Sequence, residues 1–62
     1  MELIFDNSKR SMEFDGTISR LLSELKVMRE EVVVKVNGKL VPETMKIKTN
    51  DKVEIIKVVF GG

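Results

Sequence analysis

Val32-Val33-Val34-Lys35-Val36-Asn37-Gly38-Lys39-Leu40-Val41-Pro42 is the stretch that decides how this chain folds. Its first five residues are almost all β-branched, and such residues favour a strand. Asn37-Gly38 follows at once and favours a type I′ turn, which needs a positive φ at both central positions. The stretch therefore predicts a β-hairpin with strands over 32–36 and 39–41. Pro42 places the second strand at a sheet edge, because proline cannot donate to a central ladder.

Strand patterns also lie on both sides of this hairpin. Upstream, Glu2–Asp6 and the alternating Ser11–Phe14 predict an N-terminal hairpin around the polar turn Asn7–Arg10. Downstream, Lys52–Val58 predicts the last strand. In the turn before it, we expect Asn50 to adopt a left-handed backbone, which usually favours glycine.

One helix is predicted between the two hairpins. Ile18, Leu21, Leu22 and Leu25 recur at i, i+3, i+4 and i+7, which is the spacing of one helical stripe. Thr17 precedes them and can cap the helix N-terminus through its hydroxyl. A leucine stripe can serve as a partner groove, but in a chain with one helix we interpret it as core. Residues 43–48 read as irregular, and two of their apolar side chains are expected to pack against the core: Met45 and Ile47.

Composition narrows the possible functions. The chain has 62 residues, 42% hydrophobic and 34% charged, which is typical of one small globular domain. It has no Cys and no His, so disulfides, thiolate metal sites and the commonest general base are absent. We predict no catalytic residues and no metal site. Glu30-Glu31 is an adjacent acidic pair whose side chains point apart, which favours a solvated connector.

Charge and hydropathy bear on partners and location. The net charge is +1 with both signs interspersed, and Trp and Tyr are absent, so direct nucleic-acid binding is not expected. No apolar run approaches the roughly 20 residues that span a bilayer. The acidic start Met1-Glu2 is unlike a secretory signal, so we expect a cytoplasmic protein with no membrane association.

One helix can cover only one face of a sheet, so the other face meets solvent or a partner. Strand alternation assigns the helix-facing side to Leu3, Phe5, Met12, Phe14, Val32, Val34, Val36, Val53 and Ile55. The outward side includes four apolar residues that we call the outer strip: Ile4, Val33, Ile56 and Val58. A contiguous apolar patch suggests a contact site. The alternative is that β-branched residues stand there because strands favour them.

The sequence ends in Val59-Phe60-Gly61-Gly62. Such an end is compatible with simple fraying. It also suits insertion into a partner, because glycine has no Cβ and four extended residues reach about 13–14 Å. We expect a domain over 1–58 and a flexible Gly-Gly tail over 59–62. Since no other residue offers chemistry, we interpret the Gly62 carboxylate as the functional group.

The terminal Gly61-Gly62, the segment Val36–Pro42 and Asp15-Gly16-Thr17 before the helix resemble the ubiquitin-like β-grasp sulphur carriers over nearly the whole chain. These comprise the ThiS and MoaD families and the small archaeal modifier proteins. The archaeal modifiers look most similar and the thiamine-pathway carrier is close behind. Thr49-Asn50-Asp51 stands where MoaD chains often have Asp-Gly-Asp. The resemblance implies an α+β fold, a mixed five-stranded sheet in the order 2-1-5-3-4 with one helix on one face.

The resemblance also implies a mechanism. A partner activating enzyme adenylates the Gly62 carboxylate with ATP, and sulphur then displaces AMP to give a thiocarboxylate. The carrier binds no cofactor itself and is not an enzyme. Gly61 passes through a narrow channel, and the outer strip docks on the activating enzyme. Phe60 either anchors the tail there or folds back onto the body.

Several outcomes stay open at this level. The sulphur acceptor can be tRNA, the thiazole of thiamine or molybdopterin, and Gly62 can also be joined to lysines of target proteins. Further interpretations are the small subunit of a molybdopterin synthase and a non-covalent ubiquitin-like binding module. We expect the carrier itself to be a monomer.

Overall fold

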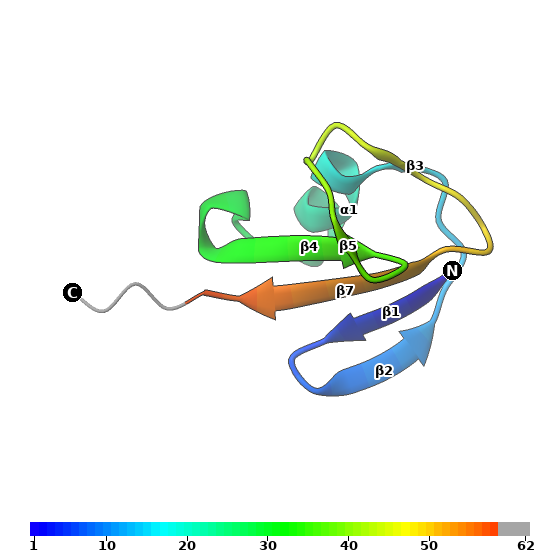
Figure 1. Ribbon diagram of the computed structural model, residues 1–62, viewed down its shortest axis with the longest axis horizontal. Coiled ribbons are helices and arrows are strands. Elements are labelled where there is room, and N and C mark those ends of the chain that lie inside the picture. The colour runs from blue at the N-terminus through cyan, green and yellow to red at the C-terminus, as the bar shows by residue number, and fades with distance from the viewer. Residues whose placement is uncertain (59–62) are drawn as a thin grey trace.

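The structure is a computed structural model and describes residues 1–58. Figure 1 shows a twisted sheet with α1 packed over one face and the N-terminal hairpin at one edge. In chain order the elements are β1 (Glu2–Phe5), β2 (Ser8–Ser11), β3 (Gly16–Thr17), α1 (Ile18–Leu25), the 3-10 helix η1 (Arg29–Glu31), β4 (Val32–Val36), β5 (Lys39–Leu40), β6 (Lys46–Ile47) and β7 (Lys52–Lys57).

The main sheet has the order β2-β1-β7-β4-β5. Its five strands, counted in chain order, therefore run 2-1-5-3-4, as predicted. β1 and β7 are parallel, and the other neighbours are antiparallel, so the sheet is mixed. This is the β-grasp arrangement. It places β7 at the centre, so the chain leaves the sheet from its middle strand.

The β4–β5 hairpin forms where the sequence predicts it. Asn37 and Gly38 have φ of 54° and 84°, the positive values that the turn needs. The Asn37 side chain also makes two hydrogen bonds outside the turn. Its Nδ2 donates to Asp51 Oδ1 at 3.0 Å and its Oδ1 accepts from Lys52 N at 3.0 Å. These two hydrogen bonds link the turn to the start of β7. β5 ends at Leu40, one residue earlier than predicted.

The N-terminal hairpin forms with a different register from the predicted one. Its turn is Asp6-Asn7, with φ of 54° and 63°, and β2 covers residues 8–11. The prediction of a turn over 7–10 and a strand over 11–14 is wrong because Asp and Asn tolerate the left-handed backbone of a two-residue turn. Met12 and Phe14 nevertheless pack against the core, half-buried, as expected.

The helix begins as predicted. Thr17 Oγ1 accepts a hydrogen bond from Arg20 N at 3.2 Å, which caps α1. Ile18, Leu21 and Leu22 are buried, and Leu25 is half-buried against them. The stripe is therefore core, and it packs on the inner face of the sheet. The buried sheet residues are Leu3, Val32, Val34, Val36, Val53 and Ile55.

A second, two-stranded sheet connects β3 with β6, and the sequence pattern does not predict it. Ile47 is buried at 1% exposure, as expected, but Met45 is 36% exposed, so its predicted burial is wrong. The reason is backbone pairing: Met45 O accepts from Ile18 N at 2.9 Å, which ties this segment to the rim of the core. Asn50 is also not left-handed. Asp51 closes that turn instead, with Oδ2 accepting from Lys48 N at 2.8 Å.

Candidate docking face

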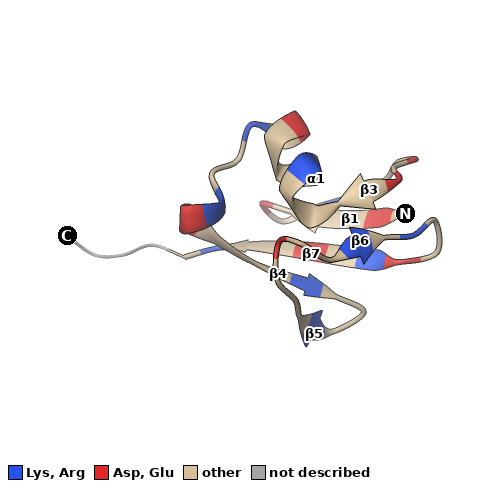
Figure 2. Cartoon of the chain, turned by 90° about the horizontal axis from the view of Figure 1, so that it is seen from above, with Lys and Arg blue, Asp and Glu red and all other residues tan. Residues whose placement is uncertain are grey.

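The sheet face opposite α1 is the candidate site, since Figure 2 shows α1 lying to one side of the sheet. Residues directly opposite each other on neighbouring strands share a face. The register places one row across all five strands, made of Lys9, Ile4, Glu54, Lys35 and Leu40. This row mixes charged and apolar side chains, so it is suited to contact with a protein surface rather than to burial.

A second row lies nearer the end of β7 and is apolar. Val33 on β4 is directly opposite Ile56 on β7. Ile56 is half-buried, and Val33 is 39% exposed. Ile4 is opposite Glu54 rather than Ile56, so it is a diagonal neighbour of Ile56. The structure thus brings three members of the outer strip together on one face.

Val58 continues the outer strip beyond the end of β7. It is half-buried, and its N–H donates to Glu31 O at 2.8 Å. This bond holds the last described residue beside η1, one position before β4 begins. Phe60, Gly61 and Gly62 lie outside the described residues, so their predicted roles stay predictions. The division into a domain over 1–58 and a tail over 59–62 also stays a prediction.

Leu40 is a residue of this face that the outer strip did not include. It is 67% exposed, the highest value among the large apolar side chains of residues 1–58 that are described as exposed. Its register partner is Lys35, which places it on the same face as Val33. A two-residue turn at Asn37-Gly38 pairs Val36 with Lys39 and Lys35 with Leu40, which puts Leu40 on the outer face, so the signal was available in the sequence.

The face is hollowed beside the outer strip. A shallow hollow of about 260 Å³ separates the end of the β1–β2 hairpin from the C-terminal half of β7. Its lining combines apolar, amide and charged groups: Ile4, Asp6, Asn7, Glu54, Ile55, Ile56 and Lys57. Lys57 Nζ is also 5.8 Å from the centre of the Phe5 ring, a cation–π distance, although Phe5 is opposite Ile55 on the helix-facing side of the sheet and does not line the hollow. A protruding partner side chain would find both apolar and polar contacts there.

The charges of the face are paired locally. Lys9 Nζ is 3.0 Å from Glu2 Oε1, and this hydrogen bond holds the pKa of Glu2 below its usual range. Lys35 and Glu54 are opposite each other, a pairing of unlike charges that favours the sheet. Both signs are spread along the chain in Figure 2. The face therefore offers no single-sign field for an anion such as a nucleic acid.

Groups suited to catalysis do not converge in the described part of the chain. Among residues 1–58, no three Asp or Glu side chains gather where they would hold a metal ion. Over the same residues, no helix is both long and apolar enough to pass through a lipid bilayer. The surface features that remain are an apolar face and a central strand that leads toward the end of the chain.

A β-grasp domain with apolar side chains on its open sheet face, beside the exit of its central strand, is typical of the ubiquitin-like carrier proteins. The comparisons with known proteins agree with this class. The sequence model of the ThiS family matches residues 2–62. The chain is a member of the ThiS family, whose members are small sulphur carriers and not catalysts. Members act with an activating enzyme and with a sulphur-acceptor enzyme.

A solved structure supports the same assignment. The crystal structure of a thiamine biosynthesis protein (ThiS) from Geobacter metallireducens matches with a TM-score of 0.68 and 28% sequence identity. The match covers 100% of this chain and 100% of that one. No curated protein sequence gives a significant match. The predicted resemblance to the ubiquitin-like sulphur carriers is confirmed, and the matched family is ThiS.

Proposed function

We propose that this protein carries sulphur on the carboxyl group of Gly62. The observation that supports this most directly is the ThiS family match, which extends through Gly61 and Gly62. The fold supports it as well, because β7 leads the chain out of the middle of the sheet beside an apolar face. The described residues contribute docking surface, and the reacting group lies at the end of the chain.

The chemistry takes two balanced steps. In the first, a carboxylate oxygen of Gly62 attacks the α-phosphorus of ATP, the bond to pyrophosphate breaks, and an acyl adenylate forms. In the second, hydrogen sulphide attacks the acyl carbon, AMP leaves with the electron pair of the C–O bond, and a proton is released. The product is a thiocarboxylate. The protein binds no cofactor in this scheme, and ATP is consumed by the partner activating enzyme.

The outer strip is the proposed docking surface for that enzyme. Val33 and Ile56 form its centre, with Ile4 beside them and Val58 leading to the tail. Gly61 would pass through a channel too narrow for a Cβ, because glycine alone lacks that atom. Phe60 would anchor the tail against the enzyme. Leu40 extends the surface at the β5 edge.

Thiamine thiazole synthesis is the acceptor pathway that we favour, because the matched solved structure is a thiamine biosynthesis protein. Thiolation of tRNA is the alternative sulphur destination. Attachment of Gly62 to lysines of target proteins is a further outcome of the same activated carboxyl group. We propose the cytoplasm as the compartment.

Intact-mass spectrometry tests the proposal. The protein is incubated with the activating enzyme encoded in the same genome, ATP and sulphide. The expected product is heavier by the difference between one sulphur and one oxygen atom. A variant lacking Gly62 is the matched control and should gain nothing. An unchanged mass for the full chain, with an enzyme shown to be active on another carrier, would refute sulphur loading.

The same reaction without sulphide separates the conjugation outcome. The chain has eight lysines, so a second copy can serve as a target. A mass equal to two chains minus one water indicates an isopeptide bond from Gly62 to a lysine. Its absence would restrict the proposal to sulphur transfer. Loss of loading in Val33→Asp, with an unchanged circular dichroism spectrum, would support the docking role of the outer strip.

A further inference from the structure

The outer edge of β4 is open over the first half of the strand. β5 pairs with β4 only at Lys35 and Val36. The segment after β5 adds one more bond, from Val41 N to Val34 O at 3.1 Å, and the return bond from Val34 N to Val41 O is not formed among residues 1–58. The start of β4 therefore has no neighbouring strand on that side within the described part of the chain.

Two backbone groups are left free at this edge. Val58 N donates to Glu31 O, so residue 31 turns its backbone groups toward β7. Alternate residues of an antiparallel strand turn them to opposite sides, so Val32 and Val34 turn theirs outward. Val32 N donates back to Arg29 O. Over residues 1–58, the carbonyl oxygen of Val32 and the N–H of Val34 thus remain available to another chain.

Apolar surface borders the open edge. A hollow of about 300 Å³ follows it, and we call this hollow the β4-edge groove. Its lining is mainly aliphatic and includes Ile18 and Leu22 of α1. Val33 and Leu40 also line it and are 39% and 67% exposed. An apolar strand with free edge groups is a template for pairing with a further strand, and the β-branched run Val32–Val36 favours such pairing.

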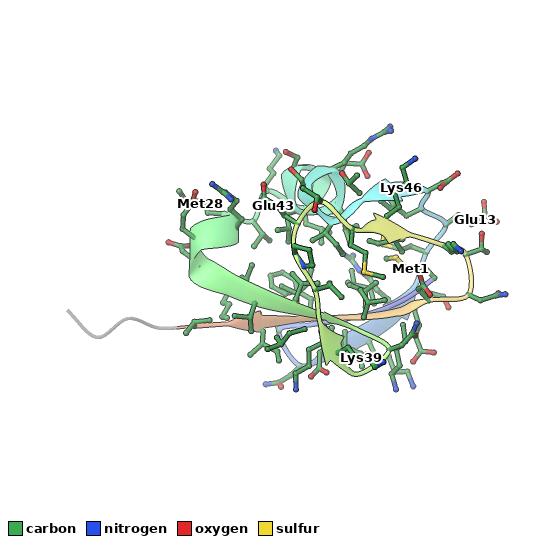
Figure 3. All side chains as sticks on the ribbon, turned by 45° about the horizontal axis from the view of Figure 1, so that its top comes forward. Met1, Glu13, Met28, Lys39, Glu43 and Lys46 are labelled. Carbon is green, nitrogen blue, oxygen red and sulfur yellow. The ribbon has the colours of Figure 1, made fainter. Side chains whose placement is uncertain are left out.

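An ion pair joins the two segments that flank the open edge. Arg29 of η1 and Glu43 of the segment after β5 both line the groove, and Arg29 Nη1 donates to Glu43 Oε2. Figure 3 shows Glu43 and Met28, the residue before Arg29, both above β4 in that view. Glu43 O accepts from Ser19 N at 2.9 Å, and Arg29 Nε is 3.5 Å from Glu30 Oε1. The hydrogen bond to Glu43 raises the pKa of Arg29, so the guanidinium stays charged at neutral pH.

A strand added at this edge would occupy the groove that the ion pair lines. Its backbone could bond to Val32 O and Val34 N, but each such bond returns little net free energy because bonds to water are lost. Covering Arg29 and Glu43 takes two charges out of water, which costs more than their attraction returns unless new polar partners satisfy both. An apolar strand supplies no such partners. The ion pair therefore opposes strand addition.

We propose that Arg29 and Glu43 guard the open edge of β4 against pairing with a second copy of this chain and thereby keep the protein monomeric. A second copy is the matching competitor because the free edge is self-complementary. In a twofold antiparallel pairing centred on Val33, the Val34 N–H of each copy meets the Val32 oxygen of the other. Such pairing would also cover Val33 of the outer strip, so the guard keeps that residue accessible for docking, a consequence that rests on the proposed function.

Sedimentation velocity tests the guard with a pair of double variants. Arg29→Met with Glu43→Gln removes both charges and keeps the side-chain lengths. Arg20→Met with Glu24→Gln is the control, since both residues are exposed on α1 and outside the groove lining. Each double variant keeps the net charge of +1. Over a roughly hundredfold range of concentration, the groove variant should self-associate at least about tenfold more strongly than wild type, and the control should not. A groove variant with an unchanged circular dichroism spectrum that stays monomeric throughout would overturn the proposal.

Amide hydrogen exchange locates the contact. In the wild-type protein the Val34 N–H should exchange faster than those of Val33 and Lys35, which are turned toward β7. In the groove variant the exchange of Val34 should slow as concentration rises. Association that leaves the Val34 rate unchanged would place the interface elsewhere and contradict the edge pairing. Neither measurement uses the activating enzyme or sulphide, so failure here is distinguishable from failure of the proposed function.

A third change tests the twofold geometry. Val33→Lys, added to the groove variant, places like charges opposite each other at the centre of the pairing, which is unfavourable. The triple variant should return to a monomer. Continued association at the strength of the groove variant would overturn the antiparallel arrangement centred on Val33.

Discussion

Replacing Lys26 by glycine should stabilise this protein. Lys26 directly follows α1 and has φ of 59° and ψ of 40°, in the left-handed region. Its N–H donates to Ser23 O at 3.1 Å, and the N–H of Val27 donates to Leu22 O at 2.9 Å. These two bonds end the helix in a Schellman motif, whose left-handed residue is usually glycine. Lys26 is exposed, so the change removes no core contact.

The expected magnitude follows from two opposing terms. A left-handed backbone costs a residue with a Cβ about 1–2 kcal/mol, and glycine avoids this cost. Glycine also makes the unfolded chain more flexible, which destabilises the fold by about 0.4–1 kcal/mol. The net gain in the free energy of unfolding is therefore about 0.5–1 kcal/mol. At 62 residues, total stability is on the order of 3–9 kcal/mol, so this gain is measurable.

Thermal and urea denaturation followed by far-ultraviolet circular dichroism provide the assay, because the chain has no Trp or Tyr for fluorescence. The Tm should rise by about 2–8 °C, at roughly 4–8 °C for each kcal/mol in a small domain. Lys26→Ala is the control, since alanine also loses the lysine side chain but keeps the Cβ. A glycine variant no more stable than the alanine variant would refute the reasoning.

Three further predictions concern the core, the turns and the docking face. Leu21→Ala should cost about 2.7–5 kcal/mol because Leu21 is fully buried, whereas Leu40→Ala should change stability by less than about 0.5 kcal/mol in the same urea titration. Asp51→Ala should lower Tm at pH 7. The Lys48 N–H and the Asn37 amide hold the pKa of Asp51 below its usual range, so its contribution is full above about pH 3.9 and lost as pH falls through the lower folded-state pKa. The Tm difference from wild type should therefore shrink in acid; a difference that grows would contradict this account. Val33→Asp should slow loading by the activating enzyme at least tenfold, while Lys46→Asp, away from the outer strip, should not.

Local patterns were enough to predict the elements that depend on neighbours in sequence. The β4–β5 hairpin follows from β-branched residues and Asn37-Gly38, and the helix follows from Thr17 and the leucine stripe. The same local patterns predict the wrong position for the first turn. Asp6 and Asn7 both tolerate a positive φ, and strand alternation alone does not select one turn position over another. The apolar character of Met45 predicts burial, but the β3–β6 pairing, which joins residues distant in sequence, positions its segment instead.

The outer strip illustrates the same limit for the candidate site. Alternation assigned Ile4, Val33 and Ile56 to one face, and the register agrees. Only the register shows that Val33 is opposite Ile56 while Ile4 is opposite Glu54. Leu40 lies on the same face because the two-residue turn pairs it with Lys35, a register that alternation along a single strand does not give.

By itself, the amino-acid sequence determined most of the strand and helix segments, the face that packs under the helix, and the absence of Cys and His. These depend on residue type and on periods of 2 and 3.6, which a single strand or helix already carries. The tertiary structure decided what lies side by side: the parallel pairing of β1 with β7, the Asn37 link to Asp51, and the uncovered edge of β4. Such contacts join residues distant in sequence, and their positions depend on how all the strands pack at once.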